Sequence, residues 1–278
     1  MAPADPRVSD APLVLLGVGD AGRAVLRLAK GRRVVATTRD PRRRAELAAL
    51  GAEVVPFDPS ALPDVVRGAD VIASFPPDGV TDALAAAACR SARAIAYVSS
   101  TGVYGSSTGR VDDATPPRAE EPRARARLAA EDAWRAAGAI VLRAPALYGP
   151  GSGLHVRLRA GTYRLPGDGS GVVSRIHTDD LAALLLAALA RATAGATYVV
   201  GDAEPSPHVD VVRWLCDRMA LPFPASAPLG ESPPTLRGSR AVDPSRALRE
   251  LAVTLRYPSF REGYAAVLAA ENELRSAP

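Results

Sequence analysis

Residues 13–22 read LVLLGVGDAG, and this stretch decides how the rest of the sequence is interpreted. Leu13–Leu16 has the length and apolar composition of a buried strand, and a helical pattern follows the last glycine. Gly17, Gly19 and Gly22 between them have the spacing G-x-G-x-x-G. The first glycine permits a tight turn, the second lets the backbone approach a diphosphate, and the third lets helix and strand pack closely.

The start of the expected helix is a candidate anion site. Free backbone N–H groups and the positive end of the helix dipole point at whatever binds there. Asp20 and Ala21 lie inside the turn and are expected beside the ligand. A plain strand-to-helix turn without a ligand is the alternative, but the strand directly before and the helix directly after favour a dinucleotide.

Further strands and helices alternate along the chain beyond this turn. Such alternation predicts a doubly wound α/β parallel-sheet Rossmann fold over residues 11–150, with a small C-terminal substrate lobe over residues 151–275 that interleaves with it. Residues 1–10 are rich in acids and prolines and are expected to be a disordered tail. The expected later strands are short apolar runs at residues 34–38, 53–57, 71–75, 94–99, 139–143 and 196–200.

The end of the second expected strand indicates which dinucleotide is preferred. An NAD site usually has an acidic residue here for the ribose hydroxyls, whereas this chain has Thr38 followed by Arg39. A guanidinium can pair with a 2′-phosphate, so NADP is the predicted cofactor, and Asp40, one residue later, keeps NAD possible. Asp58, after the third strand, is either an adenine contact or a turn residue.

Composition argues against several other classes of protein. The 278 residues are 47% hydrophobic and 23% charged, with a net charge of +4 that is spread along the chain rather than gathered on an aromatic-rich basic face. We therefore expect no nucleic-acid partner, no membrane span, and a small-molecule substrate bound by a monomer or homodimer. Cys89 and Cys216 lie far apart, which fits a reducing, cytoplasmic location, and no cysteine–histidine cluster has metal-ligand spacing.

Four later segments, read together with the glycine turn, carry a family signature. Over residues 12–270 the chain resembles an NAD-dependent epimerase/dehydratase-type member of the short-chain dehydrogenase/reductase superfamily, of the extended or atypical branch. The segments are VSSTGVYG at residues 98–105, LRAPALYGPG at 142–151, RIHTDDLA at 175–182 and YPSFREG at 257–263.

The resemblance implies a catalytic Ser or Thr, Tyr and Lys. The Ser/Thr position falls on Ser100, with Thr101 as the adjacent candidate, but Arg123 and Arg127 stand where the Tyr-x-x-x-Lys pair is usual. Arg127 could still bind the nicotinamide ribose, whereas an arginine is a poor proton shuttle because its pKa lies far above neutral pH. Pro145 is expected to line the nicotinamide side of the cofactor.

Other residues are candidates for a replacement acid/base or a substrate contact. Tyr104 is one, although the strand-end motifs that contain Tyr104 and Tyr148 also suit packing roles. His155 could touch substrate. A helix is expected to start near His177, with Asp179 or Asp180 as its cap. An anionic substrate is one possible partner of Arg157, Arg159 and Arg164, and solvent is the alternative. The run Arg42–Arg44 is interpreted as a solvated helix start.

The sequence therefore predicts an NAD(P)-binding epimerase/dehydratase-like oxidoreductase. Its substrate is expected to be a small hydroxyl- or carbonyl-bearing compound, handled by an atypical mechanism without the usual Tyr and Lys. The alternative is a non-catalytic NADP(H)-binding redox sensor or partner-binding protein, which the loss of Tyr and Lys favours. The complete glycine turn and Ser100 favour the enzyme.

Overall fold

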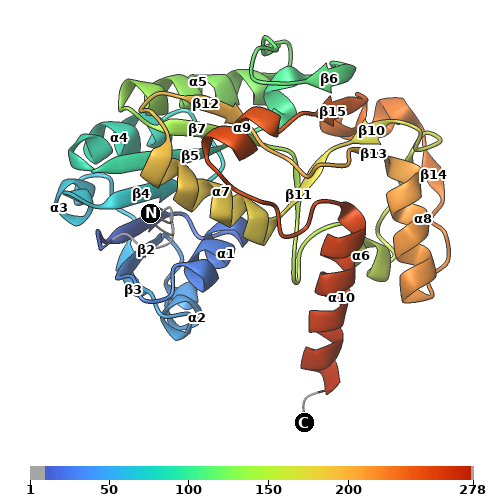
Figure 1. Ribbon diagram of the computed structural model, residues 1–278, viewed down its shortest axis with the longest axis horizontal. Coiled ribbons are helices and arrows are strands. Elements are labelled where there is room, and N and C mark those ends of the chain that lie inside the picture. Colours follow the sequence, from blue (N-terminus) through green and yellow to red (C-terminus); the bar gives the residue numbers. More distant parts are fainter. Residues whose placement is uncertain (1–9, 277–278) are drawn as a thin grey trace.

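A seven-stranded parallel sheet is the centre of the computed structural model, which describes residues 10–276 (Figure 1). The tail predicted at residues 1–10 lies, apart from its last residue, outside that range. The strand order is β12-β7-β5-β4-β1-β2-β3, which confirms the predicted doubly wound α/β fold. The strands are β1 (Leu13–Leu16), β2 (Val34–Thr38), β3 (Glu53–Pro56), β4 (Asp70–Ala73), β5 (Ala94–Ser100), β7 (Ile140–Ala144) and β12 (Thr197–Val199).

Alternate residues of β1 pack into two separate apolar cores, one on each face of the sheet. Leu13 and Leu15 belong to the first core, and Val14 and Leu16 belong to the second. A strand buried on both faces must be apolar throughout, which explains its unbroken run of aliphatic residues. The first core is covered by α1 (Asp20–Leu28), α2 (Arg44–Ala49) and α7 (Thr178–Arg191), and the second by α3 (Leu62–Val66), α4 (Thr81–Ala88) and α5 (Pro122–Ala136) (Figure 1).

The sheet ends at β12, a strand expected in the C-terminal lobe. It pairs in parallel with β7, and Thr197 lies opposite Val141. The central sheet therefore takes its last strand from beyond residue 150, as the predicted interleaving of the two parts allowed. The topological switch lies at β1, whose neighbours are β2 on one side and β4 on the other.

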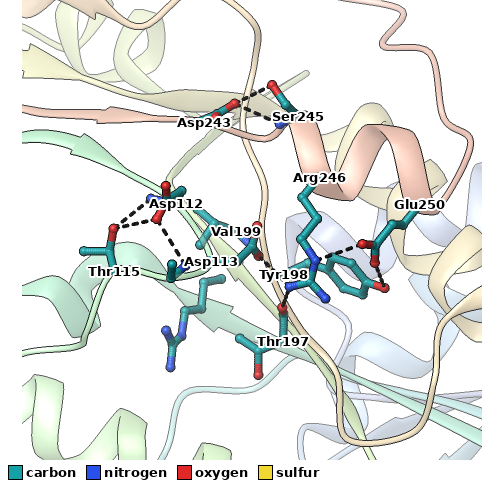
Figure 2. Close-up of polar contacts among 12 residues, drawn as sticks. Asp112, Asp113, Thr115, Thr197, Tyr198, Val199, Asp243, Ser245, Arg246 and Glu250 are labelled. Carbon is teal, nitrogen blue, oxygen red and sulfur yellow. Dashed lines mark hydrogen bonds and ion pairs between the residues drawn. The ribbon is translucent and has the colours of Figure 1, made fainter.

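Side chains cover the open edge of β12 (Figure 2). The carboxylate of Asp113 accepts a hydrogen bond from the Val199 backbone N–H at 2.7 Å, and Arg246 donates to the Thr197 carbonyl at 3.3 Å. Glu250 in turn holds Arg246 at 3.0 Å. Unpaired groups on an edge strand are open to pairing with another chain, so these contacts end the sheet.

The C-terminal region forms a second, smaller body beside the sheet (Figure 1). Its apolar core gathers Tyr148, Leu158, Leu215, Phe260 and Tyr264. A four-stranded sheet, in the order β13-β10-β15-β6, borrows β6 from the region before residue 150. The elements are β6 (Gly109–Val111), β8 (Ala146–Tyr148), α6 (Leu154–Arg159), β9 (Leu165–Pro166), β10 (Val172–Val173), β11 (Arg175–His177), β13 (Ser206–Pro207), α8 (His208–Met219), β14 (Ser226–Ala227), β15 (Arg240–Val242), α9 (Ser245–Glu250) and α10 (Phe260–Ser276).

The glycine-rich stretch at residues 149–171 contains regular secondary structure. It contains α6, because Leu158 and the adjacent apolar residues pack into the second body, and the short strand β9, which pairs with β14. Within residues 10–276, none of the helices has the length and apolar composition needed to cross a membrane.

Candidate functional site

The bend between β1 and α1 needs glycine at two positions for steric reasons. Gly17 has a φ of +82°, and a Cβ placed there would lie 3.1 Å from the Cβ of Phe75. A Cβ on Gly22 would lie 3.1 Å from the Val18 side chain and 3.2 Å from the Gly17 carbonyl. These two residues let the chain turn and let α1 approach the sheet.

Gly19, at the start of α1, faces open space instead. A Cβ added there would meet nothing within 4 Å, and no side chain among the described residues caps the helix. The first N–H groups of α1 are therefore presented to open space, which fits the binding of a diphosphate. Ala21 is buried in the first turn, and the Asp20 carboxylate accepts a hydrogen bond from Ser152 at 2.5 Å.

A cavity of about 280 Å³ adjoins the bend at the end of β2, and Gly17, Thr38 and Arg39 are in its wall. The Arg39 guanidinium lies 4.9 Å from the centre of the Phe57 ring and donates to the Thr81 hydroxyl at 2.8 Å. Its side chain is 63% exposed, so it remains open to an anion. The structure thus places both predicted residues of this strand end, Thr38 and Arg39, on one cavity.

The same cavity also contains a residue that sequence reasoning missed. Arg43, interpreted as part of a solvated helix start, lines the cavity and donates to the Val18 carbonyl at 2.7 Å. Asp40, which kept NAD possible, is engaged by the side chain and backbone of Arg42, and these hydrogen bonds lower the pKa of Asp40. The cavity therefore has two guanidinium groups, and its one acidic group is already paired with a cation.

Asp58 is not in the wall of this cavity. Its carboxylate accepts hydrogen bonds from the backbone and hydroxyl of Ser60, at 2.9 and 2.7 Å, and it is exposed. These bonds, which lower the pKa of Asp58, are those of an Asx turn, so the turn alternative describes its position.

A second cavity, of about 430 Å³, brings together three residues that the sequence resemblance singled out. Ser100 lies on its wall at the end of β5, and Arg123 and Arg127 line it from α5. Arg127 donates to the Tyr97 hydroxyl at 3.0 Å, which orients its guanidinium. The spacing of four residues places Arg123 and Arg127 on one face of α5, as the sequence comparison implied.

A third cavity, of about 150 Å³, continues from Ser100 towards the second body. Thr101 and Pro145 are in its wall. The Ser100 hydroxyl accepts a hydrogen bond from the Gly102 N–H at 3.0 Å, so its own proton remains available for another acceptor.

Tyr104 lies beneath this site rather than in it. The side chain is fully buried, and its hydroxyl accepts a hydrogen bond from Arg143 at 3.0 Å. Burial raises the pKa of Tyr104. The structure therefore gives Tyr104 the packing role that its strand-end motif allowed, and not the catalytic role.

Arg143 is part of a buried ion pair that the sequence did not reveal. It donates two hydrogen bonds to Glu131, at 3.0 and 2.8 Å, and Glu131 also accepts from Ser99 at 2.5 Å. Glu131 is completely buried and Arg143 nearly so. This network joins α5, β5 and β7 directly beneath Ser100.

Two histidines occupy structural positions. His177 is the N-cap of α7, where its Nδ1 accepts from the Asp179 N–H at 3.1 Å, so the predicted cap by Asp179 or Asp180 is wrong. Asp180 instead accepts from two backbone N–H groups of the segment before α10. His155 is fully buried with its Nε2 2.9 Å from Glu271, so it has a structural position and not the substrate contact that the sequence left open.

The three arginines proposed as anion ligands separate in the structure. Arg157 lines a fourth cavity, of about 390 Å³, in the second body. Arg159 pairs with Glu271 at 2.9 Å, and Arg164 donates to the Ser226 carbonyl at 3.0 Å. The fourth cavity also contains His208 and Arg175, neither of which the sequence analysis assigned to a site.

The cavities adjoin one another at the carboxyl ends of the parallel strands. The first and second share Pro76, the second and third share Ser100, and the third and fourth share Val173. Open parallel sheets bind ligands at this edge. Among residues 10–276, no three His, Cys, Asp or Glu side chains gather to hold a metal.

Asp202 follows β12 and is a buried carboxyl close to the fourth cavity's Arg175. Burial raises its pKa to about 7, against an ordinary value of 3.8. The folded state therefore binds a proton more tightly than the unfolded chain, so this group lowers stability as pH rises from about 4 to 7.

We expect Asp202→Asn to stabilise the protein by about 1–3 kcal/mol at pH 8 and by less at pH 5, measured by urea unfolding. Equal shifts at both pH values would contradict this, and Asp210→Asn, on the exposed face of α8, is the control.

Comparisons with known proteins relate the part of the site within residues 78–201 to one family. The model of the NAD dependent epimerase/dehydratase family matches residues 78–201. A 3-diazoavenalumate denitrifying reductase from a Streptomyces species is 30% identical over 167 residues, which span 55% of this chain and 55% of that reductase.

Solved structures extend the likeness over the whole chain. A conserved protein of unknown function from Silicibacter pomeroyi is 32% identical, with 94% of this chain and 99% of that chain covered and a TM-score of 0.81. MoeE5, solved with UDP-glucose and NAD, is 21% identical, with 96% of this chain and 100% of that chain covered and a TM-score of 0.80. At that identity the second likeness establishes the fold.

Proposed function

Because this chain belongs to the NAD-dependent epimerase/dehydratase family, we propose that it binds NADP(H) and transfers hydride to or from a small hydroxyl- or carbonyl-bearing substrate. The observation that carries the proposal is the row of adjoining cavities from the Gly17 bend to Ser100. An extended dinucleotide needs such a row along the carboxyl edge of the sheet. The NAD in the MoeE5 structure, on the same fold, supports the cofactor class.

The residues present fit this cofactor at both of its ends. The uncapped start of α1 would hold the diphosphate, and Arg39 and Arg43 would hold the 2′-phosphate in the first cavity. Arg127 would hold the nicotinamide ribose, with Pro145 close to the ring. The bound cofactor supplies or accepts the hydride. We also propose that residues 11–150 form the dinucleotide-binding part and residues 151–275 a substrate part that interleaves with it.

The proposed role of Arg39 predicts a difference between two cofactors. Arg39→Ala is expected to weaken NADPH binding about 10- to 100-fold and to change NADH binding little, because a charge-assisted hydrogen bond to the 2′-phosphate is lost. Fluorescence titration of both cofactors measures this. Arg42→Ala is the matched control, because Arg42 pairs only with Asp40 in this region and its side chain is 90% exposed. Equal losses for NADPH and NADH would refute the role.

The chemistry proposed for Ser100, Arg123 and Arg127 differs from a proton relay. The Ser100 hydroxyl can donate to the substrate oxygen, because the bond it accepts from the Gly102 N–H leaves its own proton free. Guanidinium groups stay protonated, so Arg123 and Arg127 can stabilise negative charge that develops on that oxygen but cannot return a proton. The proton would then come from water, which reaches the exposed Arg123 side of the cavity.

A turnover assay tests the proposed function directly. We expect the protein to consume NADPH when it is screened against a panel of small aldehydes and ketones, and Ser100→Ala to lower kcat more than it raises KM. Absence of binding to either dinucleotide would refute the cofactor proposal. Tight NADPH binding with no turnover would favour the second candidate, a non-catalytic redox sensor, for which Arg123 and Arg127 in place of Tyr and Lys are the supporting observation.

Assembly and location are also part of the proposal. We propose that the protein is a monomer or a homodimer. We also propose that it is located in the cytoplasm, because Cys89 and Cys216 are both free and buried, which is compatible with a reducing compartment. Light scattering of the purified chain distinguishes the two assembly states.

A further inference from the structure

Arg175 is a buried cation whose hydrogen bonding is incomplete. It lies on β11, only 3% exposed, and its Nη1 has no hydrogen-bond partner among the residues described. Its Nη2 donates to His208 Nδ1 at 3.4 Å. Burial lowers the pKa of Arg175, yet a guanidinium remains charged at neutral pH. Unpaired buried charge is strongly unfavourable, so this position calls for an anion.

The neighbouring acidic residue, Asp202, does not pair with Arg175 as that anion. The backbone N–H of Asp202 donates to the Arg175 carbonyl at 2.8 Å, so the two residues are neighbours. Neither carboxylate oxygen of Asp202 has a hydrogen-bond partner within residues 10–276. Burial raises the pKa of Asp202 and the positive charge of Arg175 lowers it in part, but no hydrogen bond joins the two side chains in the described part of the chain. Arg175 is instead one of the residues that line the 390 Å³ cavity.

The groups behind Arg175 add a second donor to the same cavity. A guanidinium has no acceptor, so His208 Nδ1 must be the unprotonated nitrogen and His208 Nε2 must carry the hydrogen. Burial, with Arg175 and Arg157 nearby, lowers the pKa of His208 to about 3, which keeps the ring neutral. Its Nε2–H then donates to the Tyr163 oxygen, and the Tyr163 hydroxyl proton is left for a cavity ligand.

We propose that this cavity binds the carboxylate end of the substrate, held by the Arg175 guanidinium and the Tyr163 hydroxyl. The inference deepens the proposed function and rests on it for the identity of the reaction. One buried cation and one hydroxyl donor match a planar group with one negative charge and two oxygens. Arg157 also lines the cavity but is exposed, so only Arg175 offers a buried positive charge, and that matches a group with a single negative charge.

The rest of the cavity suits an apolar skeleton attached to that carboxylate. Leu147, Leu154 and Val156 contribute apolar wall, and Ala146 and Val173 are shared with the cavity that leads to Ser100. A substrate anchored at Arg175 would therefore extend through apolar surface towards the proposed reaction centre. Pockets of a few hundred Å³ hold molecules of this size.

A binding experiment with a matched set of probes tests the subsite. Calorimetric titration of the full chain, with and without NADPH, compares 3-phenylpropanoate with its neutral amide, 3-phenylpropanamide, and with phenyl phosphate. We expect the carboxylate to bind at least about tenfold more tightly than either, because only it matches both donors and the single charge. Arg175→Met is expected to remove that preference and leave amide binding unchanged. Arg213→Met, on α8 outside the cavity and with a side chain that is 62% exposed, is the control, with a change below about threefold because exposed charges are screened.

Thermal unfolding of the same variants separates recognition from a structural role. An unpaired buried charge destabilises the folded state, so Arg175→Met should leave Tm unchanged or raise it. A lowered Tm together with lost amide binding would overturn the proposal in favour of a structural arginine. Equal binding of carboxylate and amide, tighter binding of phenyl phosphate, or no binding of 3-phenylpropanoate would also overturn it. The NADPH titration tests the proposed function separately, because Arg175 lies outside the cofactor cavities. If the proposed function is wrong, NADPH does not bind, whatever the result with 3-phenylpropanoate.

Discussion

Valine in place of Gly19 is expected to weaken NADPH binding at least about 100-fold while the protein stays folded, a loss of about 2.7 kcal/mol of binding free energy. The space in front of Gly19 is open, so a larger side chain meets no protein atom within 4 Å of its Cβ. It would instead stand where the diphosphate must approach the first N–H groups of α1. Fluorescence titration measures the affinity, and thermal unfolding measures the stability.

A matched glycine elsewhere provides the control for Gly19→Val. Gly230 also has open space around an added Cβ and no positive φ, and it lies far from α1 in the second body. Gly230→Val is expected to change neither affinity nor stability. Unchanged NADPH binding by Gly19→Val would show that the dinucleotide does not lie along this bend, and the proposed function would then fail.

Glutamine in place of Glu131 is expected to destabilise the protein by about 3–5 kcal/mol, since it leaves the buried Arg143 without its counter-charge. Glutamine keeps the size of the side chain, so a cavity does not contribute. Urea unfolding at neutral pH measures the change. Because Glu131 also accepts from Ser99, next to Ser100, we expect reduced turnover at temperatures where the variant is still folded.

Two further variants test this explanation. Asp132→Asn, one residue along α5, removes a carboxylate that is 74% exposed and pairs with Arg135, so it should cost less than about 1 kcal/mol. Glu131→Leu combined with Arg143→Met should recover most of the lost stability, because apolar replacement of a whole buried pair is often neutral. A double variant as unstable as Glu131→Gln would show that the hydrogen bonds to Ser99 and Tyr104, rather than the charge, hold this region.

Local patterns predicted the part of the site that lies within a few residues of a strand end. Gly17, Thr38 and Ser100 each follow a short apolar strand, and parallel strands bring their carboxyl ends to one edge. The same reasoning placed Arg39 on a cavity but not Arg43, because whether an arginine on the next helical turn points to solvent or to a cavity depends on how that helix packs. His177 was recognised as a helix start, while its role as the cap depends on a ring orientation that no sequence pattern records.

Sequence by itself determined the parallel sheet and the glycine bend, because these follow from short-range periodicity and fixed spacing. Tertiary structure decided that β12 closes the central sheet, that Glu131 and Arg143 pair, and that Arg175 faces a cavity with His208 and Tyr163. Each of these depends on residues far apart in the chain being brought together in the interior. In the interior, away from water, an unpaired charge or hydrogen-bonding group costs much more free energy than at the surface. A linear pattern of residue types does not show whether a single polar side chain is buried.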